Sequence, residues 1–176
     1  LAFDAGAYLE IGYAEPGSLI AGGTATDSIV FKNSTPGSRW GYASGERSGG
    51  IWFGSRTGAA SLLKYCLIDS ATSGVFVDSD VKLAMSNCRV TGSQFSGMNF
   101  SGGGPKDSSS FVENVFSGNR HFGIVIQANE LGNLSGTTLV AGNDSGGVLV
   151  KGETVSENAL WKKLDAPYVV HGTVHV

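Results

Sequence analysis

The chain has 176 residues and a formal net charge of −3, with 27 glycines and only 15% charged residues. A mildly acidic chain without a basic stripe is poorly suited to the phosphates of nucleic acids, so we expect no nucleic-acid partner. No apolar run approaches the roughly 20 residues that a membrane-spanning helix needs, so we also expect no membrane span.

The first part of the chain contains short segments in which apolar and polar residues alternate, the pattern of a half-buried strand. These segments cover residues 1–4, 8–11, 18–21 and 28–31, and Pro16 and Gly17 predict a turn between the second and the third. A polar, glycine-rich excursion follows at residues 33–49. We therefore expect irregular N-terminal coils with a loop insertion in residues 1–49.

A glycine followed by an apolar residue, a variable residue and a second apolar residue then recurs along the chain. The intervals between these marker glycines are 24, 23, 26 and 24 residues, and the markers are Gly50, Gly74, Gly97, Gly123 and Gly147. A fixed period of roughly 20 to 50 residues indicates a solenoid, because one unit buries its apolar face only by stacking on its neighbours. We expect regular coils over residues 50–150 and a C-terminal coil over 151–176.

The apolar residues of these repeats predict three buried ladders. Side chains alternate along a strand, so the first and third residues after each marker should point inward. The first two ladders are Ile51, Val75, Met98, Ile124 and Val148, and Phe53, Val77, Phe100, Ile126 and Val150. A second strand in each coil supplies the third ladder, which consists of Ile68, Val90, Phe116 and Val140.

The glycine-led strand followed by an N/C-x-[VIF]-x-G turn resembles the right-handed parallel β-helix repeat of pectate lyases, tailspikes and many bacterial surface proteins. Leucine-rich repeats have a similar period, but these strands lack their leucine frame, and propeller blades have longer periods. The resemblance implies an all-β fold, a right-handed single-stranded parallel β-helix of about seven coils. Residues 1–176 would then form a single β-helix domain.

The N-terminal segment also resembles secreted and surface β-helix proteins of bacteria, a group that includes predicted lipoproteins. The shared features are a Gly-Ser-Leu-Ile-Ala strand at residues 17–21, and Trp40-Gly41 followed, after an insertion, by a Gly-Gly-Ile-Trp-Phe run at 49–53. The resemblance implies an extracellular or cell-surface location. Residues 167–176 resemble the sequence that usually comes before such a segment, so we expect a domain cut from a longer array.

The position between the inward pairs should point outward, and it carries several large apolar residues. This outward column consists of Trp52, Phe76, Asn99, Val125 and Leu149. We consider three interpretations: the loop at 102–110 or a chain end covers the column, the column is a partner or self-association interface, or it stacks against a glycan. Coverage and an interface together are favoured, because aliphatic Val125 and Leu149 do not suit sugars.

Two cysteines occupy equivalent places in adjacent coils. Cys66 and Cys88 lie 22 residues apart, where later coils have Asn114 and Thr138. Stacked neighbours about 5 Å apart satisfy the distance that a disulfide requires, so a bridge is one alternative. Free, buried, stacked thiols are favoured. We expect no metal site here, because two thiolates cannot complete a zinc shell.

An enzymatic alternative rests on Asp78 and Asp80, which we expect to lie about 6 to 7 Å apart on one side of a strand or its edge. Glycoside hydrolases of this fold use pairs of carboxylates, and lyases of this fold use carboxylates together with a basic residue, often with calcium. The simpler interpretation is that these charges keep the rims of the coils soluble. The arginine-rich and paired-aspartate motifs of those enzyme families are absent from the sequence.

The sequence therefore predicts a non-catalytic β-helix domain with a structural or adhesive role, which binds a polysaccharide or a protein through its outward face. Self-association through that face is a further expectation. We expect no cofactor, with calcium as the exception that a carboxylate cluster would allow. The alternative is a polysaccharide lyase or glycoside hydrolase acting through Asp78 and Asp80.

Overall fold

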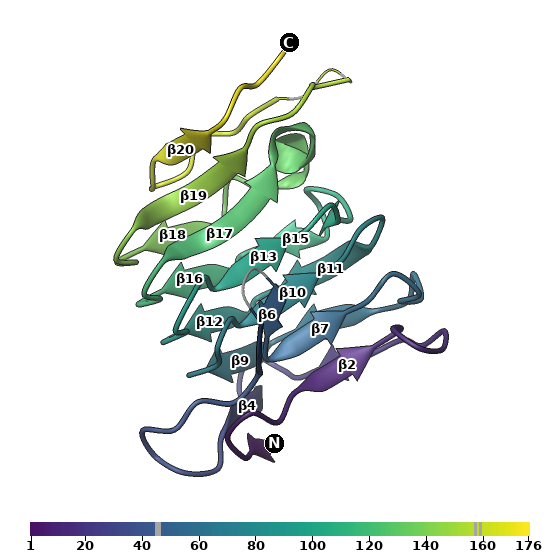
Figure 1. Cartoon of the computed structure of the whole chain (residues 1–176), viewed down its shortest axis with the longest axis vertical. Helices are drawn as coiled ribbons and strands as arrows, with labels where there is room; N and C mark the ends of the chain where they lie inside the picture. The colour runs from purple at the N-terminus through teal and green to yellow at the C-terminus, as the bar shows by residue number, and fades with distance from the viewer. Residues whose placement is uncertain (45–46, 157, 159) are drawn as a thin grey trace.

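The computed structural model describes residues 1–44, 47–156, 158 and 160–176. The chain winds into a parallel β-solenoid whose coils rise from the N-terminus at the bottom of Figure 1 to the C-terminus at the top. It has about five turns rather than the seven expected. The expectation was too high because the described parts of residues 34–49 and 152–167 contribute no strand to the three sheets of the solenoid.

The first sheet contains the strands that follow the marker glycines, and all of its neighbours are parallel. In order it consists of β2 (Leu9–Ile11), β7 (Ile51–Phe53), β10 (Val75–Val77), β13 (Met98–Phe100), β17 (Phe122–Gln127), β19 (Gly146–Lys151) and β20 (Tyr168–His171). One strand comes from each pass of the chain, so strands adjacent in this sheet are separated by a whole coil in sequence.

Two further parallel sheets complete the coils. The second sheet consists of β1 (Ala2–Phe3), β4 (Ile29–Asn33), β9 (Cys66–Asp69), β12 (Arg89–Thr91), β16 (Val115–Ser117) and β18 (Leu139–Ala141). The third sheet is shorter and consists of β3 (Ile20–Gly22), β8 (Leu62–Lys64), β11 (Lys82–Ser86), β14 (Gly104–Pro105) and β15 (Phe111–Val112). A full coil passes through the third, second and first sheets in turn.

The three predicted ladders are confirmed. Ile51, Val75 and Met98 pair in register along the first sheet, and the ladder continues through Ile124 to Val148. All residues of both first-sheet ladders are fully buried, as are the four members of the third ladder. Each fully buried aliphatic or aromatic side chain stabilises the fold by roughly 1.5–3 kcal/mol, so these ladders hold the coils together.

The marker glycines are required because the first and second sheets approach each other closely at these points. A Cβ atom at Gly74 would lie 2.2 Å from Cγ1 of Val90, and one at Gly123 would lie 2.2 Å from Cγ1 of Val140. Both valines belong to the buried third ladder, so they have no room to move. A Cβ atom at Gly50, Gly97 or Gly147 would likewise lie 2.8, 2.8 or 2.4 Å from a neighbouring atom, so the period of the glycines is the period of close packing at this corner.

Asparagine side chains tie adjacent coils together beside the apolar ladders. Oδ1 of the buried Asn119 accepts a hydrogen bond from the backbone N–H of Ser93 (3.0 Å), and Oδ1 of Asn143 accepts one from Asn119 N–H (3.0 Å). Nδ2 of Asn143 donates to the carbonyl of Phe116 at 3.0 Å. Backbone groups that the turns would otherwise leave unpaired are therefore satisfied from the next coil.

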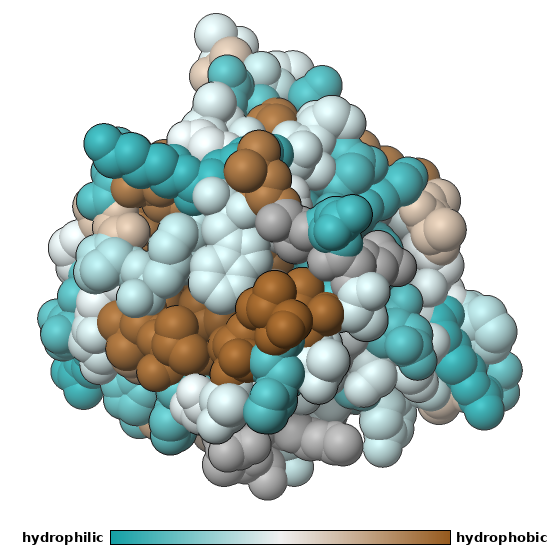
Figure 2. All heavy atoms as spheres, turned by 90° about the horizontal axis from the view of Figure 1, so that it is seen from above, coloured by the Kyte–Doolittle hydropathy of each residue, from teal (hydrophilic) through white to brown (hydrophobic). Residues whose placement is uncertain are grey.

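Two elements depart from the parallel winding. An antiparallel hairpin, β5 (Tyr42–Ser44) and β6 (Arg47–Gly49), leaves the solenoid before β7 and crosses the first sheet in Figure 1. A short 3-10 helix, η1 (Ala128–Asn133), follows β17 and buries Leu131. Figure 2, which looks onto the C-terminal end of the stack, shows apolar side chains gathered on that face. Val169 and Val170 of β20 are 38% and 50% exposed, whereas Val148 and Val150 of the preceding strand are fully buried.

Candidate functional site

The structure places the predicted outward column in one line on the first sheet. Trp52 pairs with Phe76, Phe76 with Asn99, Asn99 with Val125 and Val125 with Leu149. However, most of the column is enclosed. Trp52 is 5% exposed, Phe76 1% and Val125 6%, so these side chains do not offer a surface to a glycan or a partner.

The hairpin of β5 and β6 covers the N-terminal half of the column. The ring of Tyr42 lies 5.9 Å from the ring of Trp52, and a Cβ atom at Gly49 would lie 2.9 Å from Cβ of Phe76. The loop at 102–110, which was one of the covers considered above, does not make these contacts. That segment lies beside the third sheet instead, where Gly104 pairs with Lys82.

Three half-exposed tyrosines surround the covered Trp52. We call Tyr8, Tyr13 and Tyr42 the tyrosine platform; their exposed fractions are 39%, 55% and 38%. Tyr8 contacts Tyr42 with ring centroids 5.3 Å apart, and Tyr13 lies 5.9 Å from Trp52. Trp52 in turn contacts Phe76 edge to face at 5.1 Å. The exposed rings are thus the outer layer of an aromatic cluster anchored in the fold.

The local backbone explains why the platform forms at this place. Tyr8 and Tyr13 flank β2, whose outward residue Glu10 pairs with Trp52 in register. Gly12 turns the chain between β2 and Tyr13 with a φ of 66°, and Tyr42 begins the hairpin. Sequence reasoning missed this set because its members belong to the irregular coils and share no period. The signal that could have found them is the pair of tyrosines around β2.

The platform combines apolar rings with polar groups that are available for binding. Within the described part of the chain, none of the three phenol oxygens makes a hydrogen bond, and the Glu10 side chain is exposed beside them. Nε1 of the enclosed Trp52 also has no hydrogen-bond partner among the described residues. Such a surface can pack against an apolar ligand face while its hydroxyl and carboxylate groups bond to hydroxyls at the ligand edge.

Asp78 and Asp80 lie in a turn rather than along a straight strand. The backbone N–H of Val81 donates to the carbonyl of Asp78 at 3.4 Å, and Asp80 has a left-handed φ of 64°. Both residues therefore follow the end of β10 at Val77 and belong to the turn after it, not to the strand itself. Oδ1 of Asp78 accepts a hydrogen bond from Ser79 N–H at 2.9 Å.

The charged residue nearest in sequence to this turn, Lys82, forms an ion pair with Glu130 of η1. Lys82 therefore does not serve as a basic partner committed to the two aspartates. Among the residues that the structure describes, no group of three or more histidine, cysteine, aspartate or glutamate side chains is arranged to hold a metal ion.

Cys66 and Cys88 lie in register as free, buried thiols. The backbone N–H of Cys66 lies 3.4 Å from Sγ of Cys88, and Cys88 N–H donates to Oδ1 of Asn114 at 3.1 Å. The hydrogen bond to Cys66, together with burial, raises the pKa of the Cys88 thiol. This position is thus a small polar ladder that continues from sulfur to amide along the stack.

Comparison with known proteins agrees with the solenoid. Residues 49–160, more than half of the chain, match a family model described as "Right handed beta helix region". The chain belongs to the right-handed β-helix family, which confirms the fold class expected from the repeats. No curated protein and no solved structure matches the chain. In the part of the chain that is described, no helix is long and apolar enough to cross a membrane.

Proposed function

We propose that this chain is a non-catalytic saccharide-binding domain, located outside the cell or at its surface, and that the tyrosine platform is its binding surface. The observation that carries the proposal is the contact of Tyr13 and Tyr42 with the enclosed Trp52, each at 5.9 Å between rings. These contacts hold exposed aromatic rings in a fixed arrangement, with the Glu10 carboxylate beside them.

The chemistry of the platform suits a sugar. A pyranose ring has an apolar face of C–H groups, which packs against an aromatic ring, and hydroxyls at its edge, which bond to phenol and carboxylate groups. Because the rings already contact one another, binding orders few side chains. The loss of side-chain conformational entropy on binding is therefore small.

The size of the platform favours a saccharide over a globular protein partner. A tyrosine covers about 150–250 Å² when fully buried, so three rings exposed by 38–55% offer on the order of 300 Å² together. A stable protein interface takes roughly 800 Å² from each partner. The platform thus matches a ligand the size of a few sugar rings.

Affinity electrophoresis tests the proposal directly. The protein is run through native gels with and without a neutral polysaccharide such as hydroxyethyl cellulose, xylan or glucomannan. We expect the polysaccharide to retard the unmodified chain and a Tyr13→Ser variant to bind about two- to tenfold more weakly, since an aromatic contact contributes about 0.5–1.5 kcal/mol. Leu160→Ser, which alters another exposed apolar residue, is the matched control and should bind normally.

Three results would contradict the proposal. Equal retardation of the Tyr13→Ser variant and the unmodified chain would show that the tyrosine platform does not bind the polysaccharide. Release of unsaturated sugar products during the incubation would show a polysaccharide lyase, and the carboxylates Asp78 and Asp80 would then be examined. A stable oligomer by light scattering that dissociates in the Tyr13→Ser variant would make the platform a self-association interface.

A further inference from the structure

On a second surface of the solenoid, residues other than glycine adopt a backbone conformation that usually favours glycine. In three consecutive coils, one residue at the passage from the third sheet to the second adopts a left-handed φ: 49° at Tyr65, 54° at Asn87 and 55° at Glu113. We call this position the side-chain corner. It lies directly before β9, and one residue further back before β12 and β16.

The next corner along the coil, after the second sheet, uses the same conformation differently. There the left-handed residue is Ser70 in one coil and glycine in the three that follow, namely Gly92, Gly118 and Gly142, with φ values of 58° to 66°. Glycine adopts this conformation without steric cost, and other residues do not. Because glycine has no side chain, the glycines at this corner show that the turn requires the left-handed backbone conformation and no particular side chain.

The side-chain corner keeps side chains that the fold does not require. Asparagine adopts the left-handed region more readily than most residues, whereas tyrosine and glutamate adopt it uncommonly and at a steric cost. Within the described residues, the side-chain phenol, amide and carboxylate of Tyr65, Asn87 and Glu113 make no hydrogen bond or salt bridge, although the backbone N–H of Glu113 donates to Oγ1 of Thr137 at 3.1 Å. Nζ of Lys64 lies over the Tyr65 ring at 5.7 Å. Strained residues with uncommitted polar groups indicate a role outside the fold.

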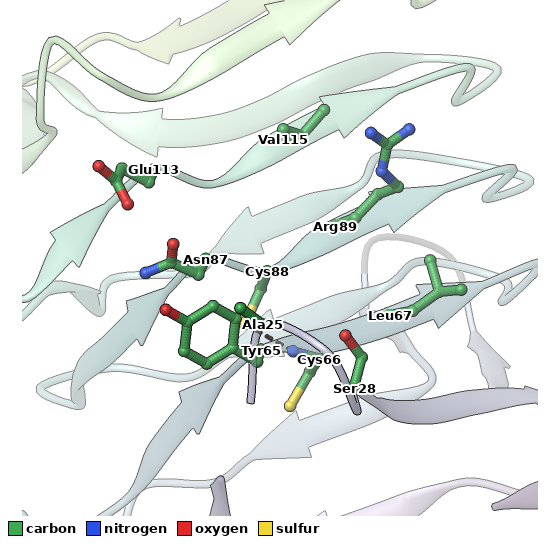
Figure 3. Close-up of a pocket in the computed structure, with 10 residues that line it drawn as sticks. All are labelled: Ala25, Ser28, Tyr65, Cys66, Leu67, Asn87, Cys88, Arg89, Glu113 and Val115. Carbon is green, nitrogen blue, oxygen red and sulfur yellow. Dashed lines mark hydrogen bonds between the residues drawn. The ribbon is translucent and has the colours of Figure 1, made fainter. Parts of the chain in front are cut away.

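These side chains form one wall of a groove of about 400 Å³. Figure 3 shows them on one side, and the outward residues Leu67, Arg89 and Val115 of the second sheet on the other, with Cys66 and Cys88 between the two walls. Arg89 pairs in register with Leu67 and with Val115. Both walls therefore follow the stacking direction, at one residue per coil and about 4.8 Å per step.

The shape and charge of the groove define its ligand. A groove along three coils fits an extended chain better than a compact molecule. Its wall groups include a phenol, an amide, a carboxylate and a guanidinium, which bind neighbouring hydroxyls through paired hydrogen bonds. Arg89 and Glu113 are the two charged residues among those lining the groove, and their charges cancel. This balance disfavours strongly anionic or cationic polymers.

We propose that the groove binds a linear, neutral oligosaccharide lying parallel to the solenoid axis. The site is separate from the tyrosine platform, which belongs to the outer face of the first sheet, and the inference does not depend on that platform. It goes beyond the proposed function by assigning a second binding site and the form of its ligand.

Glycine substitutions test the groove without weakening the fold. The double variant Asn87→Gly/Glu113→Gly removes two wall groups and relieves two left-handed residues. We expect its melting temperature to stay equal or rise, and its affinity for the oligosaccharide to fall roughly tenfold or more, as for the loss of one to two hydrogen bonds. Ser70→Gly is the matched control, since it relieves the same conformation at the other corner and should bind normally.

The measurement is a nuclear magnetic resonance titration of the labelled chain with cellohexaose, xylohexaose and mannohexaose, with oligogalacturonate as the charged comparison. We expect shifts in the amide signals of residues 65–67, 87–89 and 113–115 with at least one neutral hexasaccharide, and weaker shifts in Arg89→Gln. Absence of saturable shifts with every neutral probe would overturn the proposal, as would a preference for oligogalacturonate. A lower melting temperature in the double variant would show that these side chains serve the fold.

The Tyr13→Ser variant separates this inference from the proposed function. If it loses polysaccharide binding while the groove signals still shift, both sites exist. If the groove signals never shift while platform variants lose binding, the groove inference fails and the proposed function stands. If only groove variants lose binding, the platform proposal fails and the groove stands.

Discussion

Tyr42 and Trp52 lie with their ring centroids 5.9 Å apart, although Tyr42 belongs to an antiparallel hairpin and Trp52 to a parallel sheet. This contact joins the inserted hairpin to the solenoid and encloses the outer face of β7. It also places the partly exposed Tyr42 ring next to an interior residue. The surface chemistry at this end therefore depends on the core beneath it.

Substitution of Trp52 should destabilise the protein rather than change a binding surface. Trp52 is 5% exposed and contacts three aromatic rings, so we expect Trp52→Ala to lower the free energy of unfolding by about 3–5 kcal/mol. Urea unfolding followed by circular dichroism measures the change. Tyr13→Ser is the comparison, with an effect of about 1 kcal/mol or less at a 55% exposed ring. An unchanged midpoint for Trp52→Ala would show that the hairpin does not cover this residue.

The asparagine ladder should contribute to stability through backbone groups that have no other partner. We expect Asn119→Ala to lower the free energy of unfolding by roughly 1–3 kcal/mol, because the buried N–H of Ser93 loses its acceptor. Asn129→Ala is a suitable control, since its amide bonds to Ser156 in an exposed location. Equal losses for the two variants would mean that the position in the ladder has no special role.

The turn at Asp107 should respond to acid. Hydrogen bonds from Ser109 and Ser110 lower the pKa of the Asp107 carboxyl from 3.8 to about 2. Because the folded pKa lies below the ordinary value, the stabilisation is complete above pH 3.8 and is lost as the pH falls through about 2. A carboxyl-carbon magnetic resonance titration should give a midpoint near 2. A midpoint close to 4 would show that the serine hydrogen bonds do not persist in solution.

The two thiols should be unreactive in the native protein. Cys66 and Cys88 are 2% and 1% exposed, and the pKa of Cys88 is raised by its hydrogen bond with Cys66 and by burial. We expect a disulfide-forming thiol reagent to modify neither residue before unfolding and both residues in urea. Two reactive thiols in urea without a reductant would establish that they are free. Two that appear only after reduction would instead reveal a cross-coil bridge.

The sequence was sufficient to predict the ladders and the class of fold. Gly74 and Gly123 mark a steric contact that recurs once per coil, so their period in the chain is a direct record of the stacking. Inward positions such as Val75 and Val77 follow from the alternation of side chains along a strand. Both inferences depend on regular geometry, and regular geometry leaves a regular sequence pattern.

The candidate sites could not be predicted in the same way. Tyr8 and Tyr42 come together through an inserted hairpin, whose docking no period in the sequence encodes. Likewise, the turn at Asp78 and Asp80 depends on a left-handed residue that is not glycine, and the sequence gives no sign of it. Features that depart from the repeat therefore needed the three-dimensional structure.

The even rise of the coils makes the groove a site whose length can be set in whole steps. Each coil contacts mainly its two neighbours, so one copy of residues 66–87 inserted after residue 87 would repeat an existing interface. The insertion would add a second copy of Asn87 to one wall and a second copy of Leu67 to the other, and it would lengthen the groove by about 4.8 Å. The length of oligosaccharide that the groove can bind would then increase with the number of coils in the solenoid.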